Sequence, residues 1–265
     1  MLVVIKGAGD LASGIAVRLA HCGFSIVMTD LEKPTSIRRT VCFSEAIQKG
    51  QFCVEDVRGT FAADLSEIPE ILSRNEIAVL VDPDAHCIPL IQPDAVVDAI
   101  LAKRNLGTRI DDAPIVIGVG PGFTAGVDCR AVIETQRGHN LGRVILSGCA
   151  APNSGIPGNI SGFTIERILR APVDGIFTEI HHIGDTVEKG EIVASVEGQP
   201  IVAQLHGVIR GLLPTGTAVT AGMKSGDIDP RCVADNCYTV SDKARAIGGG
   251  VLEALLMLQK ENPYV

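Results

Sequence analysis

The hydrophobic positions at the start of the chain fall into two short runs with a helical pattern between them. Residues 2–5 (LVVI) form a continuous apolar run that predicts a buried strand. The segment that follows places Leu11, Ile15 and Leu19 on one face of a helix. Residues 25–30 (SIVMTD) predict a second strand. A strand, a helix and a second strand in this order indicate a βαβ unit of a parallel sheet.

The same alternation continues through the middle of the chain. Residues 68–76 predict a helix, residues 77–82 a strand, and residues 93–101 a further apolar stretch. The stretch 150–163 is rich in Pro, Gly, Ser and Asn and is the best linker in the sequence. We therefore expect the fold class to be α/β, with a first domain over residues 1–163.

The turn between the first strand and the first helix matches a dinucleotide-binding pattern. Gly7, Gly9 and Ala12 occupy the positions of G-x-G-x-x-G/A, where small residues allow a sharp turn, close approach of a pyrophosphate and tight helix packing. The helix start, with Asp10, would present N–H groups to the anion. Asp30 ends the second strand, where a carboxylate would bind a ribose and favour an NAD-like or adenosine ligand over NADP. These five residues are candidate cofactor-binding residues of a Rossmann-like domain; the alternative is a tightly packed turn that holds no ligand.

A polar loop follows the predicted strand at 77–82. It contains Asp82, Asp84, His86 and Cys87, and such loops at the carboxyl ends of strands carry function in open α/β sheets. Two carboxylates, an imidazole and a thiol can bind a cation or move a proton, so these are candidate catalytic residues. Their spacing matches no metal signature, and we expect no metal. The alternative is ordinary loop chemistry, because Asp-Pro turns are common.

A second glycine-rich turn links two strands without the long helix that a repeat of the first unit would insert. Gly120, Gly122 and Thr124 could form a nest of backbone N–H groups for a phosphate, or could shape a hairpin. Arg137 and His139 follow, and would bring a guanidinium and an imidazole beside the turn if the strands pair. We include all five as candidate cofactor-binding residues; a charged loop tip is the alternative for the last two.

Beyond the linker the sequence repeats itself at an offset of 32 residues, and the two copies should interlock. The matching residues are Ala171, Gly175, Gly184, Val187 and Gly190 in the first copy and Ala203, Gly207, Gly216, Val219 and Gly222 in the second. The pattern A-P-x-x-G followed by G-D-x-V-x-x-G resembles the barrel-sandwich hybrid of biotinyl and lipoyl domains, which we expect over residues 164–232. The junction at 196–201 (VEGQPI) holds no lysine, so a rigid β module is favoured over a swinging-arm carrier. Residues 233–265 should form a helical segment that packs on the first domain.

Composition narrows the choice of partners and compartment. The net charge is −8, which argues against a phosphate-backbone binder, so no nucleic acid is expected. No apolar run reaches the length of about 18 residues that a bilayer span needs, and we expect a cytoplasmic protein. The eight cysteines show no CxxC pair; in a reducing compartment they are free thiols, mostly in the core.

Several longer stretches together resemble the YqeB family of selenium-dependent molybdenum hydroxylase system proteins. They are KGAGDLASG near the start, VDPDA at 81–85, PDAVVDAILAKRNLGT at 93–108, GPGFTAGVD at 120–128 and IETQRGHNLGRVI at 133–145. The first half is also similar in type to XdhC accessory proteins, which serve molybdenum cofactor delivery and sulfuration. The resemblance implies a maturation role with a hydroxylase apoenzyme and other maturation proteins as partners. It assigns no catalytic residue.

Two functions follow as hypotheses. In the first, the chain is an accessory protein that binds a dinucleotide (NAD-like) or molybdenum cofactor and assists its delivery or its sulfur or selenium modification. In the second, it is an NAD-dependent oxidoreductase acting on a small molecule, with His86 or His139 handling the proton. A sulfur-transfer variant of the first predicts that Cys87 is a reactive thiol. Whether any reaction is catalysed is left open, as is a homo-oligomer.

Overall fold

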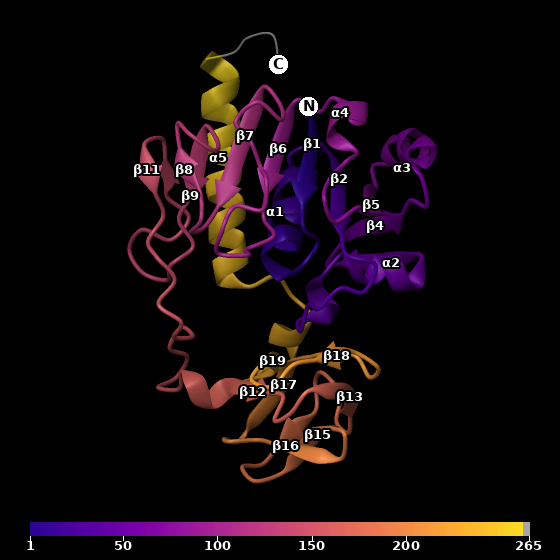
Figure 1. The fold of residues 1–265 in the computed structure, drawn as a ribbon, viewed down its shortest axis with the longest axis vertical. Coiled ribbons are helices and arrows are strands. Elements are labelled where there is room, and N and C mark those ends of the chain that lie inside the picture. The colour runs from indigo at the N-terminus through magenta and orange to yellow at the C-terminus, as the bar shows by residue number, and fades with distance from the viewer. Residues whose placement is uncertain (262–265) are drawn as a thin grey trace. The chain divides into compact units, whose positions relative to one another are not determined.

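The computed structural model describes residues 1–261 and divides the chain into two compact units (Figure 1). The first unit contains residues 1–34, 42–154 and the segment from 240 on. The second contains residues 35–41 and 155–239. The change of unit at 155 falls inside the stretch that composition marks as a linker.

The first unit is built on one nine-stranded sheet with the order β10-β9-β7-β6-β1-β2-β5-β4-β3. The strands from β9 to β4 in this order run parallel, and an antiparallel strand closes each edge. A small separate sheet pairs β8 with β11. The strand bounds are β1 Leu2–Lys6, β2 Ser25–Asp30, β3 Gln51–Val54, β4 Val57–Phe61, β5 Ile77–Val81, β6 Ala95–Asp98, β7 Ile115–Val119, β8 Thr124–Ala125, β9 Ala131–Ile133, β10 Val144–Ile145 and β11 Gly148–Cys149.

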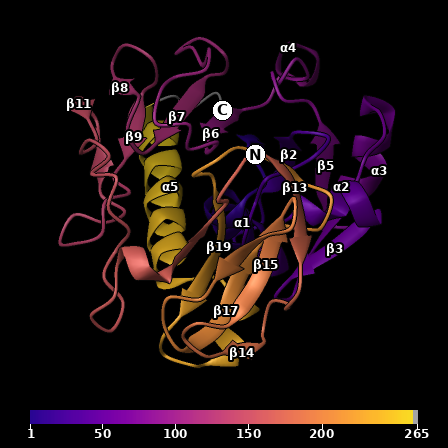
Figure 2. The ribbon, with the colours of Figure 1, turned by 60° about the horizontal axis from the view of Figure 1, so that its bottom comes forward.

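Both faces of the parallel strands are buried, which is why their sequences are continuous apolar runs rather than alternating ones. In β1, Val3, Val4 and Ile5 are all fully buried. Helix α1 (Asp10–His21) lies beside α5 (Asp242–Glu261), as Figures 1 and 2 both show. The remaining helices of this unit are short: α2 Glu45–Lys49, α3 Ile68–Ser73 and α4 Ile88–Ile91.

Small residues set the distance between α1 and α5. A Cβ atom added at Gly14 would lie 2.6 Å from the Cβ of Ala244, and one at Gly248 would lie 3.0 Å from the Gly14 carbonyl oxygen. Gly250 is as tightly packed, because its added Cβ would lie 2.0 Å from the Gly142 carbonyl oxygen. The GGG run at 248–250 therefore marks a close helix approach, and the C-terminal helix is part of the first unit.

The predicted Rossmann-like domain is corrected by this topology. After β1-α1-β2, the short helix α3 still joins the parallel strands β4 and β5, but only the four-residue α4 lies between β5 and β6. No helix lies between β6 and β7 or between β7 and β9. The helix that packs against α1 is α5, which is far from α1 in the sequence. We describe the unit as an α/β fold with a large mixed sheet.

The second unit consists of two four-stranded sheets, with the orders β12-β19-β17-β14 and β16-β15-β13-β18. The two sequence copies interlock as the repeat predicts: β13 of the first pairs with β18 of the second, and β17 of the second pairs with β14 of the first. Phe177 is fully buried in the core between the sheets. The bounds are β12 Ile168–Arg170, β13 Gly175–Glu179, β14 Thr186–Val187, β15 Ile192–Val196, β16 Gln199–Val202, β17 Gly207–Leu212, β18 Ala218–Val219 and β19 Lys224–Asp229.

Among the helices of residues 1–261, none combines the length and the apolar character required to cross a bilayer.

Candidate functional site

The order of the strands places a switch point between β1 and β6. From β1 the chain passes to β2, continues to the edge strand β3 and comes back through β4 to β5, and it then crosses to β6 on the other side of β1. Ligands of open parallel α/β sheets bind in the crevice outside the carboxyl ends of the strands at such a point. Here those ends are Lys6 and Asp98, which are paired in the sheet register.

Lys6 and Asp98 form a buried ionic cluster with Thr108. The Lys6 ammonium lies 3.4 Å from Asp98 Oδ2 and donates a 2.6 Å hydrogen bond to Thr108 Oγ1, whose hydroxyl donates to Asp98 Oδ2 at 2.5 Å. The three residues are only 4%, 1% and 2% exposed. Buried charges persist when they are paired and hydrogen-bonded, as they are here. Our sequence analysis missed this cluster, although a single charged residue ends each of the runs LVVIK and AVVD.

The glycine turn begins at Gly7, the residue after Lys6. Gly7 has a φ of +95°, and a Cβ added there would lie 3.1 Å from the Ala99 carbonyl oxygen. The segment that follows β6 therefore passes close to the turn, and the positive φ together with this close approach favours glycine. This explains Gly7 by backbone packing alone.

Asp30 binds the same turn through its carboxylate. Oδ2 accepts a 2.8 Å hydrogen bond from the N–H of Ala8, and Oδ1 accepts one of 2.8 Å from the N–H of Leu31. Burial raises the pKa of Asp30, although the hydrogen bonds from these two N–H groups act to lower it. The N–H of Gly7 donates to the Thr29 carbonyl. Asp30 thus reaches the glycine turn, and two N–H groups of that turn are bonded within the chain.

The remaining part of the motif is the first turn of α1. Gly9 is the N-cap residue and provides no side-chain cap, and Ala12 is buried in the first turn. N–H groups in the first turn of a helix have no acceptor inside the helix, and they attract anions. Ser13 holds the turn in place. Its hydroxyl donates a 3.1 Å hydrogen bond to the Ala8 carbonyl and accepts one of 2.9 Å from the N–H of Phe43.

A lysine that sequence reasoning missed lies near this helix start. Lys243 is in the first turn of α5, and burial lowers its pKa, with the neighbouring charge of Arg137 acting in the same direction. Asp10 and Glu134 oppose this shift, so both lie within electrostatic reach of Lys243. Arg137 itself forms hydrogen bonds of 2.7 and 2.9 Å with Asp242. Two predicted residues, Asp10 and Arg137, therefore lie within electrostatic reach of Lys243.

The second glycine turn bonds to and packs against other residues of the chain. The N–H of Gly120 donates to the Ile133 carbonyl, and that of Thr124 donates to Asp128 Oδ2 at 2.7 Å. A Cβ added at Gly122 would lie 2.6 Å from the Cα of Arg104. These contacts match the alternative in which the glycines shape the chain. His139 is exposed beyond β9.

The loop after β5 is built around Asp82. Its carboxylate accepts hydrogen bonds from the N–H groups of His86 at 2.9 Å and Cys87 at 2.8 Å, and so holds the loop in shape. The His86 ring is exposed, with Nδ1 3.7 Å from Asp82 Oδ1, and Asp84 is exposed. Burial, followed by Asp82, raises the pKa of the Cys87 thiol to about 12. A thiol of this kind is unsuited to nucleophilic chemistry.

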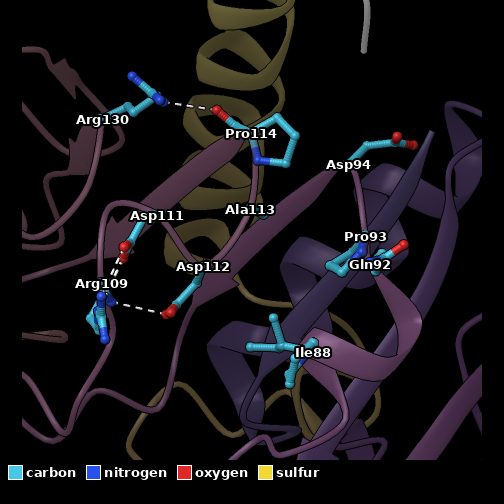
Figure 3. Close-up of a pocket in the computed structure, with 11 residues that line it drawn as sticks. Ile88, Gln92, Pro93, Asp94, Arg109, Asp111, Asp112, Ala113, Pro114 and Arg130 are labelled. Carbon is cyan, nitrogen blue, oxygen red and sulfur yellow. Dashed lines mark hydrogen bonds and ion pairs between the residues drawn. The ribbon is translucent and has the colours of Figure 1, made fainter.

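A cavity of about 790 Å³ opens at the opposite, amino edge of the sheet (Figure 3). Arg109 and Arg130 line it, together with Asp111, Asp112 and the residues that precede β6 and β7. Arg109 is bonded to Asp111 at 2.8 and 3.0 Å, and Arg130 donates to the Pro114 carbonyl at 2.8 Å. Arg109 is thus ion-paired and Arg130 is hydrogen-bonded within the chain, and none of the predicted site residues line the cavity. Within residues 1–261, no group of three or more His, Cys, Asp and Glu side chains is placed to hold a metal ion.

Comparison with known proteins finds one strong sequence similarity. The chain is 54% identical over 260 residues to a protein of Escherichia coli (strain K12) named "Uncharacterized protein YqeB". The match covers 98% of this chain but 48% of that protein, so the chain spans about half the length of its relative. No family model matches the chain.

Among solved structures, an aspartoacylase family protein from Mesorhizobium loti matches with 14% identity and a TM-score of 0.28, covering 86% of this chain and 84% of that one. A succinylglutamate desuccinylase/aspartoacylase from Rhodobacter sphaeroides matches with 14% identity and a TM-score of 0.26, covering 86% and 85%. Neither is described as a Rossmann, NAD-binding or biotinyl-type protein. The predicted Rossmann-like fold is corrected by the mixed sheet and its helix-poor connections. These similarities give no support to the predicted barrel-sandwich hybrid or to the NAD-binding role, and neither is retained.

Proposed function

The sequence similarity to YqeB supports that family name for the chain, and on this premise we propose a maturation role. In this proposal the chain assists selenium-dependent molybdenum hydroxylases by binding a phosphate-bearing cofactor of the molybdopterin or nucleotide type. It holds the cofactor at the carboxyl edge of the first unit for delivery, or for sulfur or selenium modification. Its partners are a hydroxylase apoenzyme and other maturation proteins.

The observation that carries the proposal is the start of α1 at the switch point of the sheet. Gly9 caps this helix without a side chain, so a phosphate can approach the first-turn N–H groups. Lys243 lies close enough to Asp10 for their charges to interact, and an ammonium there adds to the attraction for an anion. An approaching phosphate also stabilises the protonated form of Lys243, whose pKa burial lowers.

Asp30 supplies the second contact expected of a cofactor site. Each of its oxygens accepts one N–H from the chain, and a carboxylate oxygen has room for a second donor. A sugar hydroxyl or a pterin amino group provides such a donor. Because Asp30 is fixed by the Ala8 and Leu31 N–H groups, little side-chain freedom is lost when the cofactor binds.

Calorimetry tests this proposal, with inorganic pyrophosphate, adenosine diphosphate and a phosphorylated pterin as probes. We expect at least one probe to bind, and Lys243→Gln to weaken its binding about tenfold through the loss of one charge-assisted contact. Lys260→Gln is the matched control, because Lys260 is exposed at the other end of α5. No heat with any probe, or equal losses in the two variants, would contradict the proposed site. Native mass spectrometry of the chain purified beside its hydroxylase then tests the partner.

A further inference from the structure

Three side chains of the second unit form a chain of contacts that the proposed function does not use. The Sγ atom of Cys232 lies 3.4 Å from Nε2 of His206. Nδ1 of the same imidazole lies 3.1 Å from Oε1 of Glu188. A thiol next to an imidazole, with a carboxylate on the other ring nitrogen, is the arrangement of an activated cysteine nucleophile.

The sheet itself brings these residues together. Strands β19, β17 and β14 are neighbours in one sheet, and consecutive pairs are antiparallel. Glu188 directly follows β14, and His206 directly precedes β17, so both lie at the same end of the sheet. Cys232 follows β19, whose last residue, Asp229, pairs with Val208 at that end. Strand pairing therefore places the three loop residues at one end of the sheet, where their side chains meet.

The internal repeat provides a comparison for His206. The offset of 32 residues aligns His206 with Asp174 in the first copy. Asp174 accepts a 2.7 Å hydrogen bond from the N–H of Ala221 and thus serves the backbone of its own unit. At the equivalent position, His206 faces two reactive side chains instead. The fold does not require an imidazole there, because the first copy closes with a carboxylate.

Exposure allows a reactant to reach the thiol. Cys232 is exposed, and the His206 side chain is 51% exposed. By contrast, Cys87 and Cys129 are buried, and burial raises their thiol pKa to about 12 and about 11. Cys22 is exposed like Cys232 and provides a reference for an ordinary accessible thiol.

We propose that Cys232 is a nucleophilic thiol that exchanges with the sulfur–sulfur bond of a disulfide or persulfide, with His206 as its base. The Cys232 thiol proton passes to Nε2 of His206, and the thiolate attacks one sulfur of the S–S bond. A new S–S bond to Cys232 forms as the old one breaks, and the leaving thiolate takes the proton from His206. Glu188 accepts a hydrogen bond from the Nδ1–H of the ring, which leaves Nε2 unprotonated and able to act as the base. This activity lies in the second unit and does not depend on the proposed cofactor site.

The test measures exchange rates of the full chain with glutathione disulfide and with glutathione persulfide, resolved by peptide mass spectrometry. At neutral pH we expect Cys232 to react about tenfold faster than Cys22, because the imidazole at 3.4 Å takes the thiol proton as the sulfur attacks. The added mass distinguishes the two sources: a glutathionyl group from the disulfide, or a single sulfur atom from the persulfide. Faster reaction at Cys232 than at Cys22 with either reagent supports the proposal.

Variants separate activation from simple exposure. His206→Gln should bring the rate of Cys232 down to that of Cys22, and Glu188→Gln should lower it about threefold by releasing the ring. His182→Gln is the matched control, because His182 is an exposed histidine of the same unit. An unchanged melting temperature shows that each variant is folded. If Cys232 reacts no faster than Cys22, or if His206→Gln leaves its rate unchanged, the proposal is wrong.

Discussion

Removing the Asp98 carboxylate should destabilise the first unit strongly. Asp98→Ala leaves the Lys6 ammonium, 4% exposed, without its charged partner at 3.4 Å. Thr108 would still accept a hydrogen bond from Lys6, but its own hydroxyl would lose the Asp98 acceptor. Breaking a buried pair from one side costs about 3–5 kcal/mol, and we expect a loss of unfolding free energy in that range.

The double variant Lys6→Met/Asp98→Leu distinguishes an unpaired charge from lost packing. Replacing both charges with apolar side chains should recover most of the stability, since no buried charge then remains. Asp84→Ala is the control, because Asp84 is an exposed acid of the same unit, and it should change stability by less than about 0.5 kcal/mol.

Urea unfolding, followed by hydrogen exchange of the β1 and β6 amides, reports on the unit concerned. A loss below about 1 kcal/mol for Asp98→Ala would refute the reasoning. So would a double variant that is less stable than the single one.

Four further outcomes are expected. Gly7→Ala should lower the unfolding free energy by about 1–2 kcal/mol in urea titrations, because alanine is strained at the φ of +95° and its Cβ meets the Ala99 carbonyl oxygen. Burial raises the pKa of Asp30, so the folded protein binds the Asp30 proton more tightly than the unfolded chain does. The stability that this proton contributes is fully present below pH 3.8 and is lost as pH rises through the folded pKa. Asp30→Asn should flatten this part of the stability–pH curve. Anion binding should weaken as pH rises through the pKa of Lys243, which lies below 10.5, and calorimetry of Lys243→Gln should show no such loss. Iodoacetamide at mild pH should modify Cys87 about a hundredfold more slowly than Cys22.

The sequence predicted the local elements of the first thirty residues and the interlocking repeat. Continuous apolar runs identify β1 and β2, and helical spacing identifies α1, because these patterns depend on neighbouring residues only. The repeat also predicted that the two copies interlock, and their strands do pair with each other. What failed was the extension of the first βαβ unit to a whole Rossmann-like domain, since the later connections carry little or no helix.

The candidate site depended on contacts that no local pattern contains. Lys243 lies over two hundred residues from Asp10 in the sequence, and its place near α1 follows from close helix packing at Gly14. The glycines at 120 and 122 satisfied a phosphate-binding pattern, yet neighbouring backbone and side chains need the same small residues. Cys232 and His206 lie in loops at the ends of the paired strands β19 and β17, so composition alone gave no reason to single out this thiol.

Amide hydrogen exchange with and without inorganic pyrophosphate tests the cofactor site most directly. The account predicts that pyrophosphate slows exchange at residues 9–12, in the first turn of α1, and that Lys243→Gln abolishes this protection at the same concentration. Protection confined to the cavity at the amino edge of the sheet, or no protection in any segment at a saturating concentration, would contradict it.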